Sequence, residues 1–130
     1  MTDAYQRPYR PVVLDGAQLK EFAFGPMIEQ LHGERAAADG DRSALTLVHG
    51  EGLTVVLTVA RPGTRCEPHD AAGPTMLLVL SGTIAVGAEG ERHRVEKGGA
   101  LAIGASVRHE IDAESDCAFL TIIGEQESGA

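Results

Sequence analysis

The chain contains no tryptophan, and only 4% of its 130 residues are aromatic. Its interior must therefore be built mainly from aliphatic side chains. Long hydrophobic runs are missing as well, because the longest strongly apolar run, from Met76 to Leu80, is far too short to span a bilayer. The first residues do not show a basic segment followed by an apolar stretch, so we expect no signal peptide and a cytoplasmic location.

Basic residues are also scarce. There are 11 Lys and Arg against 19 Asp and Glu, which gives a formal net charge of −8. Phosphate backbones and anionic lipids need a basic surface, so nucleic acid and membranes are not expected partners. The two cysteines, Cys66 and Cys117, form no CxxC pattern, and we expect both to be free thiols in a reducing compartment.

The length fits one domain with one sizeable core. We divide the chain into an N-terminal arm with a short helix (1–43), a β-barrel (44–124) and a flexible tail (125–130). Gly25-Pro26 opens the predicted helix, because proline suits a first helical position and apolar residues follow at helical spacing. Gly33 is the predicted end of this helix.

From Ser43 onward the chain consists of short segments of high β propensity, separated by glycine and other turn residues. The predicted strands cover 44–48, 53–60, 64–71, 75–80, 83–87, 91–95, 100–103, 107–113 and 117–123. Many short strands at regular spacing indicate an all-β sandwich or barrel of the jelly-roll type.

Two histidines lie inside glycine-punctuated segments. The first segment begins at Gly63, reaches His69 and ends at Gly82, and the second begins at Gly98 and reaches His109. Together they resemble the two signature motifs of the cupin superfamily. This resemblance implies a double-stranded β-helix, a small-molecule site in the barrel mouth that often holds a metal, and a homodimer.

The resemblance carries over residue by residue. His69 and His109 fall on two of the four usual metal-ligand positions of the family. Ala71 and Thr75 stand where the family has its other two ligands, a histidine and a glutamate. The match therefore indicates the fold and the place of the site, and it leaves the reaction open.

One hypothesis is a three-ligand metal site formed by Glu67, His69 and His109. Strict strand alternation puts Glu67 and His69 on one face and Cys66 on the other. Two histidines and one carboxylate suit non-heme iron, and manganese, nickel, copper or zinc is also chemically admissible. The metal would act as a Lewis acid or activate dioxygen.

Two further hypotheses need no metal. In the first, His109 or His69 acts as a base and Glu67 as an orienting or acidic group, in an isomerisation, cyclisation, dehydration or epimerisation. In the second, the barrel binds a small organic molecule without turning it over, as a sensor or binding module. The predicted pocket lining is Thr75, Leu77, Val79, Leu101 and Ile103. Ordinary barrel core is the competing interpretation of the aliphatic members, because any barrel strand shows such aliphatic alternation.

Overall fold

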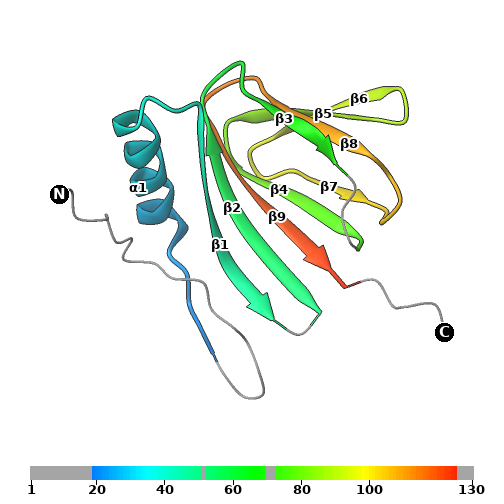
Figure 1. Cartoon of the computed structure of the whole chain (residues 1–130), viewed down its shortest axis with the longest axis horizontal. Coiled ribbons are helices and arrows are strands. Elements are labelled where there is room, and N and C mark those ends of the chain that lie inside the picture. The colour runs from blue at the N-terminus through cyan, green and yellow to red at the C-terminus, as the bar shows by residue number, and fades with distance from the viewer. Residues whose placement is uncertain (1–18, 51, 70–72, 126–130) are drawn as a thin grey trace.

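The computed structural model describes residues 19–50, 52–69 and 73–125, and Figure 1 shows their arrangement. One helix precedes nine strands in the described part of the chain. Their bounds are α1 (Phe24–Ala37), β1 (Arg42–Gly50), β2 (Leu53–Ala60), β3 (Arg65–His69), β4 (Thr75–Ser81), β5 (Thr83–Ala88), β6 (Glu91–Glu96), β7 (Ala100–Ile103), β8 (His109–Ala113) and β9 (Cys117–Gly124). All nine predicted strands are present, most with ends within one or two residues of those expected.

The strands form two antiparallel sheets. The five-stranded sheet has the order β1-β2-β9-β4-β7, and the four-stranded sheet has the order β3-β8-β5-β6. Strands far apart in sequence are paired, such as β2 with β9 and β3 with β8, so early and late strands of the barrel lie side by side. The predicted all-β jelly-roll architecture is confirmed.

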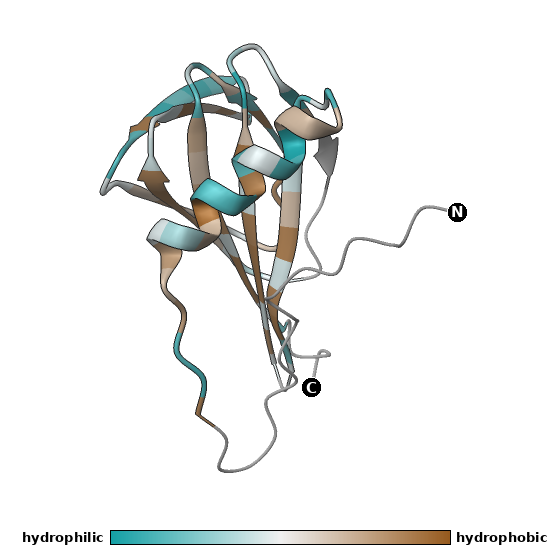
Figure 2. Ribbon diagram, turned by 90° about the vertical axis from the view of Figure 1, so that its left-hand side faces the viewer, coloured by the Kyte–Doolittle hydropathy of each residue, from teal (hydrophilic) through white to brown (hydrophobic). Residues whose placement is uncertain are grey.

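Two apolar clusters stabilise these layers. An inner core lies between the sheets and includes Leu77, Val79, Ile84, Val86 and Phe119. An outer core lies between the five-stranded sheet and α1, and its buried members are Met27, Leu31, Leu45, Leu47, Val48, Leu57, Val59, Ala118 and Leu120. Figures 1 and 2 show α1 on the outer side of this sheet, where it packs against β1 and β2. The five-stranded sheet is therefore apolar on both faces.

The predicted helix end at Gly33 is wrong, because α1 continues to Ala37. An added Cβ at Gly33 would meet nothing within 4 Å, so this glycine occupies an open position on the helix. A glycine inside a helix costs about 1 kcal/mol relative to alanine. Burial of Met27 and Leu31 against the sheet offsets that cost, and the chain leaves the helix at Asp39, whose φ is 53°.

Three glycines of the two histidine-containing segments occupy backbone conformations that favour glycine. Gly63, Gly82 and Gly98 have φ values of 86°, 72° and 86°, which are left-handed conformations that other residues rarely adopt. At Gly82 a side chain is excluded twice, because an added Cβ would also collide with the Asp116 carbonyl oxygen. These glycines set the turns that bring the histidine-bearing strands into their sheet.

No helix in the described residues has the length and the apolar character required to cross a membrane.

Candidate functional site

The pairing of β3 with β8 brings the two motif histidines together in the backbone. Arg65 is paired with Asp112, Cys66 with Ile111, and His69 with His109. Between Cys66 and His69 the register shifts, since three steps along β3 match two steps along β8. This is the signature of a β-bulge, in which one extra residue interrupts the alternation of faces.

The bulge corrects the predicted orientation of Cys66. Strict alternation placed Cys66 on the face opposite to the barrel interior, but this side chain packs against the inner core. Its partner Ile111 is a buried member of the same core. The alternation rule failed here because it assumes a regular strand, and β3 carries an extra residue.

His109 is the buried polar residue of this region. Its side chain is 2% exposed and lies on the same face of β8 as Ile111 and Ala113, which belong to the inner core. Its Nδ1 is 3.3 Å from the Val107 carbonyl oxygen. A carbonyl oxygen can only accept, so this contact requires a proton on Nδ1. In the neutral ring the lone pair then lies on Nε2, which is shielded from solvent.

The outer face of β8 is electrostatically different. Arg65 Nε donates to Asp112 Oδ1 at 2.9 Å, and Arg92 Nη1 donates to Asp112 Oδ2 at 3.0 Å. The hydrogen bond from Arg65 is the largest cause that holds the pKa of Asp112 below its ordinary value, with Arg92 contributing in the same direction. The side chain of Asp112 therefore ties β3, β8 and β6 together across the outer surface.

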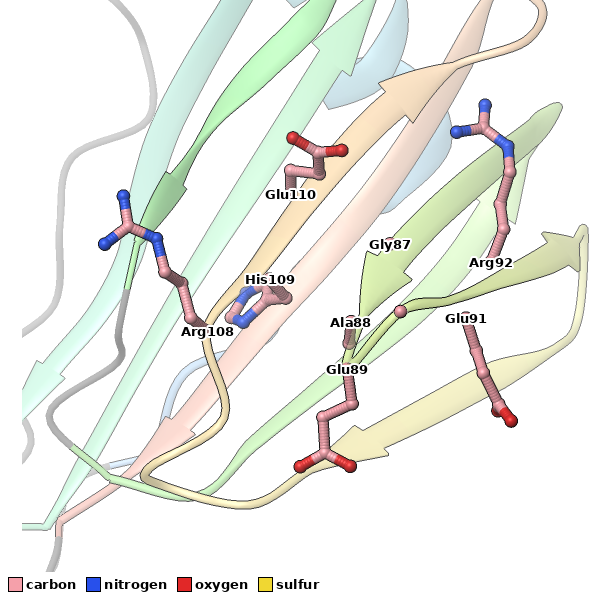
Figure 3. Close-up of a pocket in the computed structure, with 9 residues that line it drawn as sticks. Gly87, Ala88, Glu89, Glu91, Arg92, Arg108, His109 and Glu110 are labelled. Carbon is pink, nitrogen blue, oxygen red and sulfur yellow. The ribbon is translucent and has the colours of Figure 1, made fainter.

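A groove of about 440 Å³ lies at one end of the four-stranded sheet (Figure 3). Gly87 of β5 is paired with Arg92 of β6 on one side and with Glu110 of β8 on the other. Because Gly87 has no side chain, only its backbone lines the groove between these two charged residues. An added Cβ at Gly87 would lie 3.3 Å from Glu110 Oε1. Among the described residues, those that line the groove are Gly87, Ala88, Glu89, Gly90, Glu91, Arg92, Arg108, His109 and Glu110.

Of the sequence-predicted site residues whose side chains the structure describes, His109 alone lines this groove. Sequence reasoning missed Arg92, Arg108 and Glu110. The many charged residues of Glu91–Glu96 and the alternating charges from Glu110 to Glu114 were a signal for solvent-facing positions. That signal does not show which charged residues become neighbours, because the pairing of the strands determines their positions.

The predicted pocket residues lie elsewhere. Leu77, Val79 and Ile103 are buried members of the inner core, and Leu101 packs against it. Thr75 is buried as well, and its hydroxyl donates to the Gly73 carbonyl oxygen at 3.2 Å. None of the five lines the groove described above. Their role as a ligand pocket remains a prediction.

The remaining predicted site residues are described only in part. The structure gives the backbone of Glu67 and His69 within β3, and Ala71 lies outside the described residues. Within the described part of the chain, no group of three or more His, Cys, Asp and Glu side chains is arranged to hold a metal ion. The proposed metal set therefore rests on His109 and on the backbone register of β3.

Both cysteines are free thiols, as predicted. Burial raises the pKa of the Cys117 thiol to about 11, and the proximity of Cys66 acts in the same direction. A thiol with this pKa stays protonated near neutral pH and is a poor nucleophile or metal ligand. Cys117 therefore acts as a packing residue of the inner core.

Comparison with known proteins agrees with this architecture. Residues 56–123, just over half of the chain, match the family model of the cupin domain (Cupin_2). No curated protein sequence matches the chain.

Solved structures resemble the chain in fold. A cupin superfamily protein from Desulfitobacterium hafniense has a TM-score of 0.63 at 16% identity, covering 65% of this chain and 78% of that one. KdgF from Halomonas sp. has a TM-score of 0.61 at 21% identity, covering 68% and 82%. Salicylate 1,2-dioxygenase from Pseudoaminobacter salicylatoxidans, in a structure of its adducts with gentisate, has a TM-score of 0.66 at 19% identity. The match covers 78% of this chain but only 31% of the dioxygenase.

Proposed function

We propose, from the premise that this chain belongs to the Cupin_2 family of cupin domains, that its barrel binds a small organic molecule at the end of β8 that carries His109. The observation that carries the proposal is the environment of His109. This imidazole is almost completely buried, is oriented by a backbone carbonyl, and contributes to a groove of about 440 Å³. Grooves of this size suit small ligands that a few polar groups fix in place.

The chemistry of His109 favours proton transfer. With Nδ1–H directed at the Val107 carbonyl oxygen, Nε2 is the ring atom left for proton transfer to and from a bound carbonyl compound. Nε2 is shielded from solvent, so this transfer requires a local movement that opens the ring to the groove. An imidazole can both accept and donate a proton, so this side chain serves both directions of such a transfer. His69, the backbone partner of His109, is the proposed second group, and Glu67 is the proposed orienting or acidic group. Isomerisation, cyclisation, dehydration and epimerisation are the reaction classes that this set supports.

A second candidate is a metal-dependent reaction, and the register of β3 and β8 favours it. Directly opposed residues of an antiparallel pair have Cβ atoms about 4.5–5.5 Å apart, a spacing that allows two imidazoles to share one cation. Nε2 of His109 has the lone pair that a ligand needs. His69 and His109 with Glu67 would hold iron, manganese, nickel, copper or zinc. Such an ion would polarise a substrate oxygen or activate dioxygen.

The third candidate is binding without turnover, in which the same residues recognise an effector. Cupin neighbours include a dioxygenase solved with gentisate adducts, which supports a small organic ligand for this chain without specifying one. A homodimer and a cytoplasmic location also remain predictions at this point.

The deciding experiment compares wild type with His109→Gln, using His93→Gln as the matched control on the exposed strand β6. Metal content is measured by plasma mass spectrometry on protein purified without a nickel column. Binding is measured by calorimetry against a panel of small keto acids, aromatic acids and hydroxy acids. The proposal predicts that a panel member binds wild type and the control, and that His109→Gln binds at least about tenfold more weakly.

The same preparation separates the candidates. Stoichiometric transition metal that is lost in His109→Gln supports the metal-dependent form. Turnover of the bound compound by metal-free protein supports acid–base catalysis, and binding without turnover in either state supports the sensor. Equal affinity of wild type and His109→Gln for every bound compound overturns the proposed role of His109.

A further inference from the structure

One row of paired residues crosses the four-stranded sheet at the end where the groove lies. His69 of β3 is paired with His109 of β8. Ala88 of β5 is paired with His109 on one side and with Glu91 of β6 on the other. Residues that are directly opposed in antiparallel strands have their side chains on the same face of the sheet. The side chains of Ala88 and Glu91 therefore lie on the inner face of the sheet, with the buried ring of His109.

The opposite face of these strands carries other charged residues of the groove. Arg92 follows Glu91 and Glu110 follows His109 in sequence, so both point to the outer face. Figure 3 shows Arg92 and Glu110 on one side of the strands and Glu91 on the other. Arg92 and Glu110 take part in ion pairs on the outer face. Among the strand residues that the structure describes in the groove, Glu91 is the ionisable one that shares the inner face with His109.

Ala88 leaves space between these two side chains. Adjacent strands of a sheet are about 4.8 Å apart, so the backbones of His109 and Glu91, two strands apart, are separated by about 10 Å. In this row only the methyl group of Ala88 lies between them. All three residues line the groove of about 440 Å³. A small organic molecule that lies over Ala88 would therefore meet His109 on one side and Glu91 on the other.

The carboxylate of Glu91 is only weakly held. Its side chain is 76% exposed, and its Oε2 lies 3.7 Å from Nε2 of His93, whose side chain is 41% exposed. An exposed pair of this length contributes little to stability. His93 does not belong to the groove lining among the described residues. Glu91 can therefore turn toward a molecule over Ala88 and can exchange protons with water, at the solvent end of a groove whose other wall is the buried His109.

We propose that Glu91 is the second catalytic residue of this site, and that the reaction inverts a carbon atom next to a carbonyl group. The inference rests on the proton transfer assigned above to His109. Neutral His109 removes the proton from this carbon, and the electron pair of the broken C–H bond moves to the carbonyl oxygen and gives an enolate. The protonated carboxyl group of Glu91 then donates a proton to the opposite face of the carbon as the carbonyl group forms again.

The reverse reaction uses the same two groups with their roles exchanged. The carboxylate of Glu91 removes the proton, and the protonated ring of His109 donates one from the other side. One proton leaves the carbon and one enters it, so atoms and electrons balance without a co-reactant. Exchange with water returns both groups to their starting protonation states. Two proton-transfer groups on opposite walls of one groove favour inversion over the other reaction classes named above.

Glu91 thus takes the part that the sequence analysis gave to Glu67. The two carboxylates belong to strands on opposite sides of β8, since Glu67 lies in β3 and Glu91 in β6. A molecule over Ala88 lies between β8 and β6, on the side of Glu91. Substitution of each carboxylate separates the two assignments.

The test measures hydrogen exchange and inversion separately on the full chain. Chiral 2-hydroxy acids and 2-hydroxy ketones, which have one C–H bond beside a carbonyl group, are incubated with the protein in D₂O. Proton NMR measures the exchange of this hydrogen, and chiral chromatography measures inversion. The variants are Glu91→Gln and Glu67→Gln. Glu96→Gln is the matched control, because this carboxylate is exposed on the opposite face of the same strand.

A steric variant tests the place of the ligand. Ala88→Val fills the space between His109 and Glu91, and a β-branched residue suits a strand, so the fold should be retained. Ala100→Val makes the same change at an exposed position of β7. Circular dichroism melts of all variants check the fold.

We expect wild type, Glu96→Gln and Ala100→Val to catalyse both exchange and inversion. Glu91→Gln should lower inversion at least about 100-fold, as for the loss of a general acid or base, while His109 still exchanges the hydrogen of one enantiomer. Ala88→Val should lose both activities, because the molecule no longer fits.

Inversion that survives in Glu91→Gln overturns the inference and leaves the proposed role of His109 intact. So does inversion that is lost in Glu67→Gln and kept in Glu91→Gln. Equal loss of exchange and inversion in Glu91→Gln would make Glu91 a binding residue, and full activity of Ala88→Val would place the molecule elsewhere, so either result also overturns it. If wild type exchanges none of the compounds, the proton transfer proposed for His109 is itself wrong, and this inference fails with it.

Discussion

His69 and His109 are direct partners in the antiparallel pairing of β3 and β8. The two residues come from different sequence motifs, and the bulge in β3 sets the register at which they meet. Directly opposed residues of an antiparallel pair are close enough for their side chains to interact. We predict such an interaction between His69 and His109, and it can be measured without knowing the ligand.

A double-mutant cycle measures that interaction. We expect His69→Ala and His109→Ala to destabilise the fold non-additively, with a coupling of about 0.5 kcal/mol or more in the free energy of unfolding from urea titrations. Substitutions at separated sites usually add within about 0.3–0.5 kcal/mol. A coupling inside that range would show that the two side chains do not meet.

Gly82→Ala should be among the most damaging single substitutions in the chain. Its φ is positive and an added Cβ would collide with the backbone oxygen of Asp116. Gly90→Ala is the matched control, because its φ is also positive but an added Cβ would meet nothing within 4 Å. We expect a loss of about 1–2 kcal/mol at Gly90 from the left-handed conformation alone. Gly82→Ala should lose clearly more or fail to fold, and equal losses would contradict the predicted collision.

Asp112→Asn should make stability less dependent on pH. The pKa of Asp112 is lowered in the folded protein, mainly by the hydrogen bond from Arg65, so its charged form stabilises the fold above its ordinary pKa of 3.8. This contribution is lost as pH falls through the lower, folded value. Asp112→Asn should therefore cost about 1 kcal/mol at pH 7, typical of a partly exposed charge network. The difference from wild type should shrink below about pH 4.

Urea titrations at pH 7 and pH 3 measure this difference. Glu96→Gln is the control, because its carboxylate is exposed and lies 3.7 Å from Arg94. The control should change stability little at either pH. If the free energies of unfolding of wild type and Asp112→Asn differ by the same amount at pH 7 and pH 3, ionisation of Asp112 does not contribute to the pH dependence of stability.

The two thiols should react at different rates with a disulfide reagent at pH 8. Cys66 is half-buried, whereas Cys117 is fully buried and has a pKa of about 11. Relative to the ordinary thiol value of 9.0, this shift lowers the thiolate fraction of Cys117 about 100-fold. Cys66→Ser should remove the fast phase, and the slow phase should accelerate with rising pH or urea. A single fast phase for both thiols would contradict the burial of Cys117.

Leu77→Ala distinguishes core from pocket lining. If Leu77 packs in a closed core, as its complete burial indicates, truncation should cost about 2–5 kcal/mol in the free energy of unfolding. Leu53→Ala, at a partly exposed position of β2, should cost well under half as much. A loss below about 1 kcal/mol at Leu77 would instead favour a pre-existing cavity beside this residue.

The strands could be predicted from sequence because residues at or next to the strand ends mark where each strand stops. Glycine, proline and acidic turn residues mark most of them, and the hairpin of Ala88, Glu89 and Gly90 has the two consecutive positive φ values that a tight turn requires. The end of α1 could not be predicted in this way. Gly33 is a plausible stop by its own propensity, and only the packing of the helix on the sheet shows why the helix continues.

The site was less predictable than the fold. His109 was identified by its motif, and its burial agrees with an inward position. The orientation of Cys66 was predicted wrongly because strict alternation assumes a regular strand. Pro68 is a sequence signal of an irregular segment, but it does not show that the register shifts between Cys66 and His69. The groove around Gly87 was not predicted, because only the pairing of β5 with β6 and β8 places Arg92 and Glu110 on either side of this glycine.

The five-stranded sheet separates two apolar clusters that share no buried residue. Neighbouring residues of a strand point to opposite faces of the sheet, so each cluster packs with its own set of side chains. The barrel interior can therefore diverge to accommodate a new ligand while the helix-bearing side is left intact. Conversely, the helix-bearing side can acquire new contacts without retuning the interior. The two faces of the five-stranded sheet can thus change separately during evolution within a single small domain.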